Sequence, residues 1–321
     1  MSALATKPLP PGARPFDVVG FGVNAMDITA AVDGFPEPDT KAPMQAFTIE
    51  GGGITATAMV ACARLGLKTR YIGKFGSDFW SRLGMRSLTR EGIDTSAVLR
   101  TPGEGHVSIV IADRRTHQRT LFRRRPAAYD IAPDEMSRAA IVAGRLLHVD
   151  GVDAAAAAQA MRWAREAGMI VTMDGDRIVP GVEAACREAD LLVCGPRFLA
   201  GVTGKSDLRE GLAAFAGLGV ARVAVTLGEK GSLGFAQGRF CEAPAFLVES
   251  VDTNGAGDVF HGACAVGELR EWPLLDTLTF ASAVAAMKCR KPGGRAGAPT
   301  LAQTQDFLRE RGFARLAAAT T

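Results

Sequence analysis

Short apolar runs alternate with helical segments in the second half of the sequence, and this alternation restricts the fold more than any other feature. The runs have the length of buried strands and lie at Leu146–Asp150, Ile170–Asp174, Leu191–Cys194 and Val223–Leu227. Segments with helical periodicity separate them, at Ala154–Ala167, Gly181–Glu188 and Leu208–Leu218. Strands that alternate with helices form a parallel sheet covered on both faces. The pattern therefore predicts a doubly wound α/β fold with helices on both faces.

Other parts of the chain fall outside this alternation. A first buried strand is expected at Phe16–Gly22, but the short strands predicted within about 25–50 and 105–125 do not follow the pattern. We expect them to form a small β-sheet lid that excludes water from a reaction. The predicted organisation is a flexible tail over residues 1–15 and one domain over residues 16–321. After the last strand of the series we expect antiparallel strands at Gly234–Ala243 and Ala245–Val251, then helices at Val259–Glu271, Leu274–Lys288 and Leu301–Arg311.

Composition favours a cytoplasmic globular protein without a nucleic-acid or membrane partner. The net charge of +3 is too small to indicate nucleic-acid binding. Six cysteines are scattered and form no C-x-x-C pair, which argues against a zinc or redox site and fits a reducing compartment. The first residues have no apolar core typical of a signal peptide, and no apolar run reaches the roughly 18 residues that a membrane span needs.

The strongest candidate site is a glycine-rich turn, DTNGAGD at Asp252–Asp258, that leads into an apolar helix. Unshielded N–H groups at a helix start bind anions. Asp258 lies in this positive environment, where its carboxylate stays ionised unless something else raises its pKa. An anion cradle beside a carboxylate fits phosphoryl transfer, in which the carboxylate accepts a proton from the attacking hydroxyl. On local chemistry alone, a simple glycine-rich helix cap is equally compatible with this turn.

Two further segments are candidates for ligand contacts. Gly51–Gly53 precede the helix expected over Ala56–Leu65, where they either offer bare N–H groups to a ligand or form a flexible turn. The hairpin near 107–125 carries six arginines, which form a solvated face or include one or two that clamp an anionic group. These are Arg114, Arg115, Arg119, Arg123, Arg124 and Arg125.

Other sequence signals exclude several kinds of site. Gly20 and Gly22 form a G-x-G pair, but the third glycine and the following helix of a dinucleotide fingerprint are missing. The sequence has no P-loop, H-E-x-x-H or G-x-S-x-G motif.

Ligands of open parallel sheets bind at the carboxyl ends of strands. Polar or glycine residues follow three predicted strands there: Asp27, the pair Asp174 and Asp176, and Thr226 with Gly228.

Four motifs, in this order along the chain, resemble those of the ribokinase-like (PfkB) carbohydrate kinases. They are GGGITATAMVACARLG from residue 51, YIGKFGSDFWSRLGMRSLTREGIDTSAV from residue 71, VAVTLGEKGSLGF from residue 223 and VDTNGAGDVF from residue 251. The resemblance covers nearly the whole chain. It implies an ATP-dependent kinase that phosphorylates a sugar hydroxyl.

The resemblance also implies roles for individual residues. Asp258 would be the general base, and the N–H groups of Gly255, Ala256 and Gly257 would bind the transferred phosphoryl group. The residues implied to hold the sugar are Asp27, Gly52, Gly53 and Thr57, the last standing where the family often has Asn. Thr226 and Gly228 would lie near the nucleotide, with Ser282 beside the adenine. Asp252 and Gly293 stand where many members bind a monovalent cation such as K⁺, and Mg²⁺ would arrive with ATP.

Besides Thr57, the sequence departs from the family at a second place, the N-x-x-E motif. Where many members have N-x-x-E, this chain has Gly195-Pro196-Arg197-Phe198. No residue there is expected to organise Mg²⁺, which leaves open a catalytically weakened, sugar-sensing homologue. A nucleoside kinase would need an aromatic-lined acceptor pocket. The N-terminal segment offers mainly Phe35 and Phe47, which disfavours this alternative.

Within the family, the chain is similar to the sulfofructose kinase subgroup. The segments that carry this similarity are GGGITATA, MDGD, DVFHGACAV and KCRKPGGRAGAP. The implied acceptor is a ketose-like, anionic sugar whose sulfonate would meet Lys41. Val152 stands near the place of another expected basic residue, for which Arg123 would substitute. Kinases of 2-keto-3-deoxygluconate, fructose or another sugar remain alternatives. By analogy we also expect a homodimer that forms through the lid.

Overall fold

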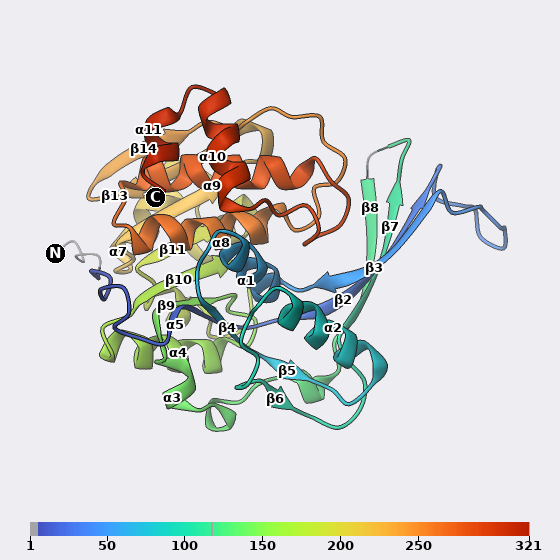
Figure 1. Cartoon of the computed structure of the whole chain (residues 1–321), viewed down its shortest axis with the longest axis horizontal. Coiled ribbons are helices and arrows are strands. Elements are labelled where there is room, and N and C mark those ends of the chain that lie inside the picture. Colours follow the sequence, from blue (N-terminus) through green and yellow to red (C-terminus); the bar gives the residue numbers. More distant parts are fainter. Residues whose placement is uncertain (1–5, 117, 321) are drawn as a thin grey trace.

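The computed structural model describes residues 6–116 and 118–320, and an eight-stranded sheet forms its centre (Figure 1). The strand order is β14-β13-β12-β11-β10-β9-β1-β4. Six strands are parallel: β1 (Phe16–Phe21), β4 (Thr69–Ile72), β9 (Gly144–Val149), β10 (Ile170–Gly175), β11 (Leu191–Cys194) and β12 (Arg222–Thr226). This arrangement confirms the predicted doubly wound α/β fold.

An antiparallel hairpin extends one edge of the sheet. It consists of β13 (Ser232–Ala236) and β14 (Arg239–Ala243), joined by Gln237 and Gly238, which both have positive φ, as a tight hairpin turn requires. The strand predicted at Ala245–Val251 is wrong. Phe246 of this segment packs instead of pairing, since its ring lies against those of Phe307 and Phe313.

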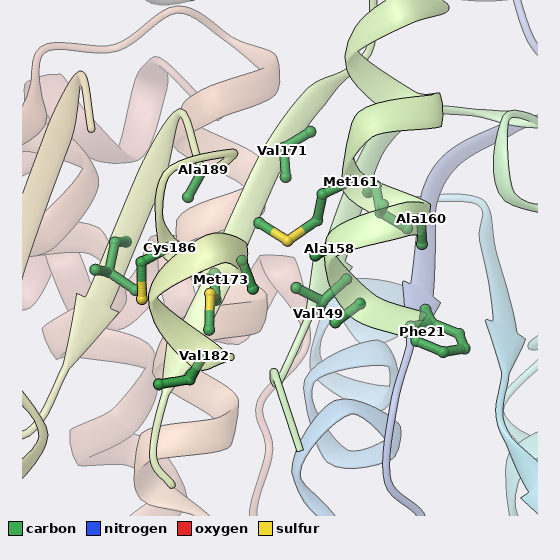
Figure 2. Close-up of a cluster of buried hydrophobic side chains, with 14 of the residues drawn as sticks. Phe21, Val149, Ala158, Ala160, Met161, Val171, Met173, Val182, Cys186 and Ala189 are labelled. Carbon is green, nitrogen blue, oxygen red and sulfur yellow. The ribbon is translucent and has the colours of Figure 1, made fainter. Parts of the chain in front are cut away.

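Helices cover both faces of the sheet, as expected for parallel strands that are apolar on both sides. One face packs against α4 (Ala154–Glu166), α5 (Val182–Cys186), α6 (Pro196–Thr203) and α7 (Leu208–Gly217). Figure 2 shows part of this core, where Met161, Val182 and Cys186 lie against Val149 and Met173. The other face packs against α1 (Ile54–Arg64), α8 (Ala256–Leu269), α9 (Leu274–Cys289), α10 (Leu301–Glu310) and α11 (Ala314–Ala318).

Smaller elements complete the body. They are β5 (Lys74–Phe75), β6 (Leu99–Arg100), α2 (Phe79–Arg90), α3 (Arg138–Ile141) and 3-10 turns at Ala127–Tyr129, Pro133–Glu135 and Gly228–Lys230. Among the described residues, no helix is both long and apolar enough to pass through a lipid bilayer.

A second, four-stranded sheet projects from the body, in the order β3-β2-β7-β8 (Figure 1). Its strands are β2 (Ala25–Val32), β3 (Ala46–Gly52), β7 (Val107–Asp113) and β8 (Gln118–Arg124). We call this sheet the lid. Its register places Glu50, Asp27, Ser108 and Arg123 opposite one another in a row that crosses all four strands. Side chains in one such row project from the same face of a sheet.

The N-terminal segment lies closer to the body than the sequence indicates. The sequence predicts a flexible tail over residues 1–15, whereas residues 6–15 contact the α/β body. Thr6 Oγ1 donates to Asp190 Oδ1 at 2.7 Å, and Arg145 Nε donates to the Leu9 carbonyl oxygen at 2.6 Å. Asp190 and Arg145 are buried charged residues, so these polar contacts help to satisfy them. Residues 1–5 are outside the described part of the chain.

Candidate active site

The glycine-rich turn forms the start of α8. Gly255 caps the helix in the left-handed conformation (φ 75°), and a Cβ there would lie 2.7 Å from the Gly294 carbonyl oxygen, so only glycine fits. Among the described residues, the N–H groups of Gly255, Gly257 and Asp258 have no hydrogen-bond acceptor, whereas that of Ala256 donates to the Thr253 carbonyl oxygen at 3.2 Å. The space beside Gly257 is open. The turn therefore presents free donors to an incoming anion.

Asp258 lies in the first turn of α8 and faces other carboxylates. Burial raises its pKa well above the ordinary aspartate value, and the nearby charges of Asp174, Asp176 and Asp27 raise it further. The Arg295 guanidinium opposes this shift. The sequence predicts an ionised Asp258 unless a neighbour raises its pKa, and the structure supplies such neighbours. A carboxylate with a raised pKa holds a proton more readily, which suits a general base.

Asp174 lies near the end of strand β10, which packs against α8. Its Oδ2 lies 3.1 Å from Nε2 of His261, which is one turn further along α8 than Asp258. The ring of His148 on β9 lies 5.8 Å from that of His261 in a tilted arrangement, and burial lowers the pKa of His148 to about 3. His148 is therefore neutral at physiological pH. These contacts fix the end of β10 against the helix that carries Asp258.

Asp27 lies in β2 of the lid and points toward the glycine-rich turn. Burial raises its pKa, while a hydrogen bond with Ser108, the charge of Arg295 and a hydrogen bond with Asn254 lower it. A Cβ on Gly52 would lie 2.2 Å from Asp27 Oδ2, so the glycine lets the backbone meet this carboxylate. Asp27, Gly52 and Asp258 are thus brought to one side of the molecule, between lid and body.

Arg295 is a residue that the sequence analysis did not single out. It is buried and donates to the Gly52 carbonyl oxygen, to Ser87 Oγ at 2.9 Å and to Thr57 Oγ1 at 3.3 Å. Thr57 therefore uses its hydroxyl to hold Arg295 rather than pointing it freely at a ligand. The only local signal in the sequence is one arginine inside the glycine-rich stretch PGGRAG.

Further polar contacts join the lid to the body, in addition to those of Arg295 with Gly52 and of Asp27 with Asn254. Glu50 of β3 accepts a hydrogen bond from the Gly294 N–H. Arg119 of β8 donates from Nη1 to Asn254 Oδ1 at 3.1 Å, so a lid arginine reaches the glycine-rich turn itself. Both contacts hold the lid over the first turn of α8.

Two arginines, Arg123 and Arg177, contribute positive charge beside this site. Burial lowers the pKa of Arg123, and the nearby charge of Arg177 lowers it further, while Asp176 raises it. The buried ring of His106 senses the same charges, because burial, Arg125, Arg123 and Arg177 lower its pKa to about 4. Arg177 lies two residues after the end of β10 and was not identified from the sequence. The charges of Arg123 in the lid and Arg177 in the body therefore act on the same part of the site.

The other candidate residues named from the sequence lie in several different parts of the fold. Lys41 is exposed in the loop between β2 and β3, and this loop projects away from the body (Figure 1). Thr226 ends β12 and Gly228 opens the following turn, while Ser282 is buried in α9, a helix that packs on β13 and β14. Gly293 donates its N–H to Asp252 Oδ2 at 2.8 Å. Gly53, the N-cap of α1, has φ 92° and lies close against the Asn24 backbone.

Comparisons with known proteins agree with this geometry. A model of the pfkB family carbohydrate kinases matches residues 16–301. The chain is 24% identical over 320 residues to the probable fructokinase-5 of Arabidopsis thaliana, covering 92% of this chain and 98% of that protein. It is 26% identical over 322 residues to a 5-dehydro-2-deoxygluconokinase of Shouchella clausii, covering 93% and 97%.

Solved structures show the same fold. A putative ribokinase from Agrobacterium tumefaciens superposes with a TM-score of 0.86 at 25% identity, covering 92% of this chain and 98% of that one. A putative ribokinase II from E. coli, solved in complex with ATP and Mg²⁺, gives a TM-score of 0.80 at 19% identity, covering 92% and 99%. Because the family model spans most of the sequence, this chain belongs to the PfkB family of carbohydrate kinases, ATP-binding phosphotransferases that use an alcohol group as acceptor.

Proposed function

We propose that the protein phosphorylates a ketose-like sugar that carries an anionic group, as 6-deoxy-6-sulfofructose does. The observation that carries this proposal is the polar row across the lid, in which Asp27 and Arg123 share one face. Asp27 is suited to accept hydrogen bonds from sugar hydroxyls, and Arg123 is suited to bind an anion. A single acceptor that contacts both would therefore carry hydroxyls at one end and negative charge at the other.

In the proposed reaction, a sugar hydroxyl oxygen attacks the γ-phosphorus of ATP. The new oxygen–phosphorus bond forms, the bond to the ADP oxygen breaks, and the hydroxyl proton passes to Asp258. The free N–H groups of Gly255 and Gly257 at the start of α8 face the negative charge on the transferred phosphoryl oxygens. Asp27, Gly52 and Gly53 hold the sugar, and the lid excludes water from the transfer.

The distance across the lid suits a sugar of hexose size. Asp27 and Arg123 lie two strands apart, and a strand spacing of about 4.8 Å separates their backbones by roughly 10 Å. Both side chains are long enough to reach inward from these positions. Arg177 approaches from the body, so the anionic group would lie between two guanidinium groups. In this proposal Lys41, in its exposed loop, is not needed for anion binding.

The nucleotide is proposed to bind on the body side, at the carboxyl end of β12. Thr226 and Gly228 would lie near its phosphates and Ser282 beside the adenine. Among the described residues, no group of three His, Cys, Asp or Glu side chains is arranged to hold a metal ion. We therefore propose that Mg²⁺ binds mainly through the phosphates of ATP. Dependence on ATP and the free cysteines support a cytoplasmic location.

We also propose that two copies pair through their lids. The lid face opposite Asp27 exposes Phe47, Ile49, Ile109 and Phe122, each more than 40% accessible. Exposed apolar surface of this kind on a sheet marks an interaction site. Sedimentation velocity should show a dimer, and replacing Phe122 with Glu should shift the protein to monomers. A wild-type monomer at micromolar concentration would contradict the pairing.

A phosphorylation assay tests the proposed acceptor. Fructose, tagatose, 2-keto-3-deoxygluconate and sulfofructose are compared, and the anionic ketose should give the highest kcat/KM. Arg123→Ala should lower kcat/KM for the anionic sugar by about 10- to 100-fold, since it removes charge-assisted hydrogen bonds, and should change that for fructose little. Arg124→Ala is the matched control, because its side chain projects from the opposite lid face and pairs with Glu104.

The same assay separates the alternatives. A higher kcat/KM for fructose than for either anionic sugar would favour the fructokinase activity that the Arabidopsis relative is named for. Turnover of 2-keto-3-deoxygluconate alone would favour a sugar-acid kinase. Sugar and ATP binding without any turnover would indicate a sugar-sensing homologue, the reading that the missing N-x-x-E motif leaves open.

A further inference from the structure

A buried lysine contacts the backbone of the phosphoryl-transfer turn. Lys288, in the last turn of α9, has no solvent-accessible surface, and its Nζ donates to the Asp252 carbonyl oxygen at 2.7 Å. Asp252 is the first residue of the turn that ends in Asp258. Lysine is almost never fully buried without a partner, because burying its charge is costly. The hydrogen bond to Asp252 therefore supplies the partner that this buried lysine needs.

The surroundings of Asp252 do not fit the monovalent cation that the family resemblance implies. K⁺ binds to groups of oxygen atoms, such as backbone carbonyls. Here Asp252 Oδ1 accepts the N–H of Asn254 at 2.8 Å, and Oδ2 accepts the N–H of Gly293 at 2.8 Å. The third oxygen, the carbonyl, accepts Lys288. Each oxygen of Asp252 thus already accepts a hydrogen bond from a donor of this chain, and one of these donors is the N–H of Gly293.

The charges near Lys288 match a cation at this position. Burial lowers the pKa of Lys288, whereas the carboxylates of Asp252 and Glu50 favour the charged form of its amine and the charge of Arg119 opposes it. Glu50 also accepts the Gly294 N–H, so lid, turn and Lys288 meet around the same group of residues. A positive charge here offsets the two carboxylates and holds the turn against α9.

We propose that the Lys288 ammonium takes the place of the monovalent cation, so that this kinase works without K⁺. Lys288 acts as a positioning residue: it binds the backbone of Asp252 and thereby fixes the turn that presents Gly255, Gly257 and Asp258. It does not touch the sugar or the nucleotide. The inference rests on the kinase activity of the family and not on which sugar is the acceptor.

The wild-type enzyme provides the first test. Turnover of the best sugar of the panel is measured in KCl and in tetramethylammonium chloride at equal ionic strength, with ATP and Mg²⁺ constant. The two rates should agree within about twofold. Activation by K⁺ of about tenfold or more would overturn the proposal. If no sugar is turned over, the melting temperature with ATP bound is compared in the two salts, where a K⁺-specific increase would overturn it equally.

Variants separate positioning from simple stabilisation. Lys288→Met keeps the volume but removes the charge, and should lower kcat by about 10- to 100-fold with little change in sugar KM, because the turn is misplaced. In Lys288→Ala, which leaves space for an ion, ammonium or K⁺ should restore part of the rate, and Lys288→Arg should retain most of it. Lys74→Met is the control, because Lys74 is also buried and donates to the Asp130 carbonyl oxygen and Glu135, in a different part of the body.

The outcomes are distinct. Lys74→Met should lower the melting temperature without a response of kcat to ammonium. If Lys288→Met lowers only the melting temperature and Lys288→Ala shows no response of kcat to ammonium, Lys288 is only a structural residue and the proposal fails. If Lys288→Met does not fold, the salt comparison on the wild-type enzyme decides the question.

Discussion

The body and the lid contribute to the candidate site by different means. In the body, the 252–258 turn is held by backbone geometry: Gly255 is confined by Gly294, and α8 packs against β10 through His261 and Asp174. In the lid, the contribution comes from side chains in one row, and polar contacts such as that of Arg119 with Asn254 join it to the body. From this comparison we propose that the body determines the reaction, whereas the lid selects the acceptor.

The largest effect is expected from Asp258→Asn in the body. This change removes the proposed base while it keeps the shape of the side chain, so kcat should fall by about 10³-fold for every sugar. ATP affinity should stay nearly unchanged, since the N–H groups of the turn remain. Steady-state kinetics and calorimetric ATP titration measure the two quantities. Wild-type turnover in the variant would remove Asp258 as the base.

Gly52→Ala tests the junction between the two regions. The added Cβ would lie 2.2 Å from Asp27 Oδ2, so the carboxylate must move. We expect KM for the sugar to rise about 10- to 100-fold, because small displacements of a positioning group are costly. Gly217→Ala, on α7 with open space around the new Cβ, is the matched control. Equal sugar KM values in the two variants would show that Asp27 does not hold the sugar.

The pH profile tests the group of carboxylates in the body. The base works when deprotonated, so activity falls as the pH drops through the raised pKa of Asp258. Burial is the main cause of that shift, and Asp176 adds to it. Asp176→Asn should therefore move the acidic limb of kcat/KM to lower pH. Glu183→Gln on α5 should leave the limb in place, and an unmoved limb in both variants would contradict the coupling.

The smallest effect is expected from the contact that closes the lid. Arg119→Ala removes the exposed hydrogen bond to Asn254 and should lower kcat/KM by roughly two- to fivefold. Arg114→Ala is the control, because Arg114 lies near the outer end of the lid and pairs with Asp33. An identical small loss in both variants would assign the effect to surface charge instead of lid closure.

The sequence predicts the body better than the junction between body and lid. The DTNGAGD turn and the alternation of strands and helices are local patterns, so both can be predicted from the sequence. Arg295 and Lys288 act through contacts with residues more than 30 positions away, and no local pattern indicates them. The apolar run at Ala245–Val251 resembles a strand, but tertiary packing of Phe246 on Phe307 decides its structure. The short helix α6 has too few residues to show a clear period.

One kinetic comparison tests the division between reaction and acceptor choice most directly. The ratio of kcat/KM for sulfofructose to that for fructose is measured in the wild type, in Asp258→Asn and in Arg123→Ala. Asp258→Asn should lose activity on both sugars and keep the ratio, whereas Arg123→Ala should lower the ratio by about tenfold or more. If Arg123→Ala leaves the ratio unchanged, the lid does not select the acceptor through this arginine, and the account is contradicted.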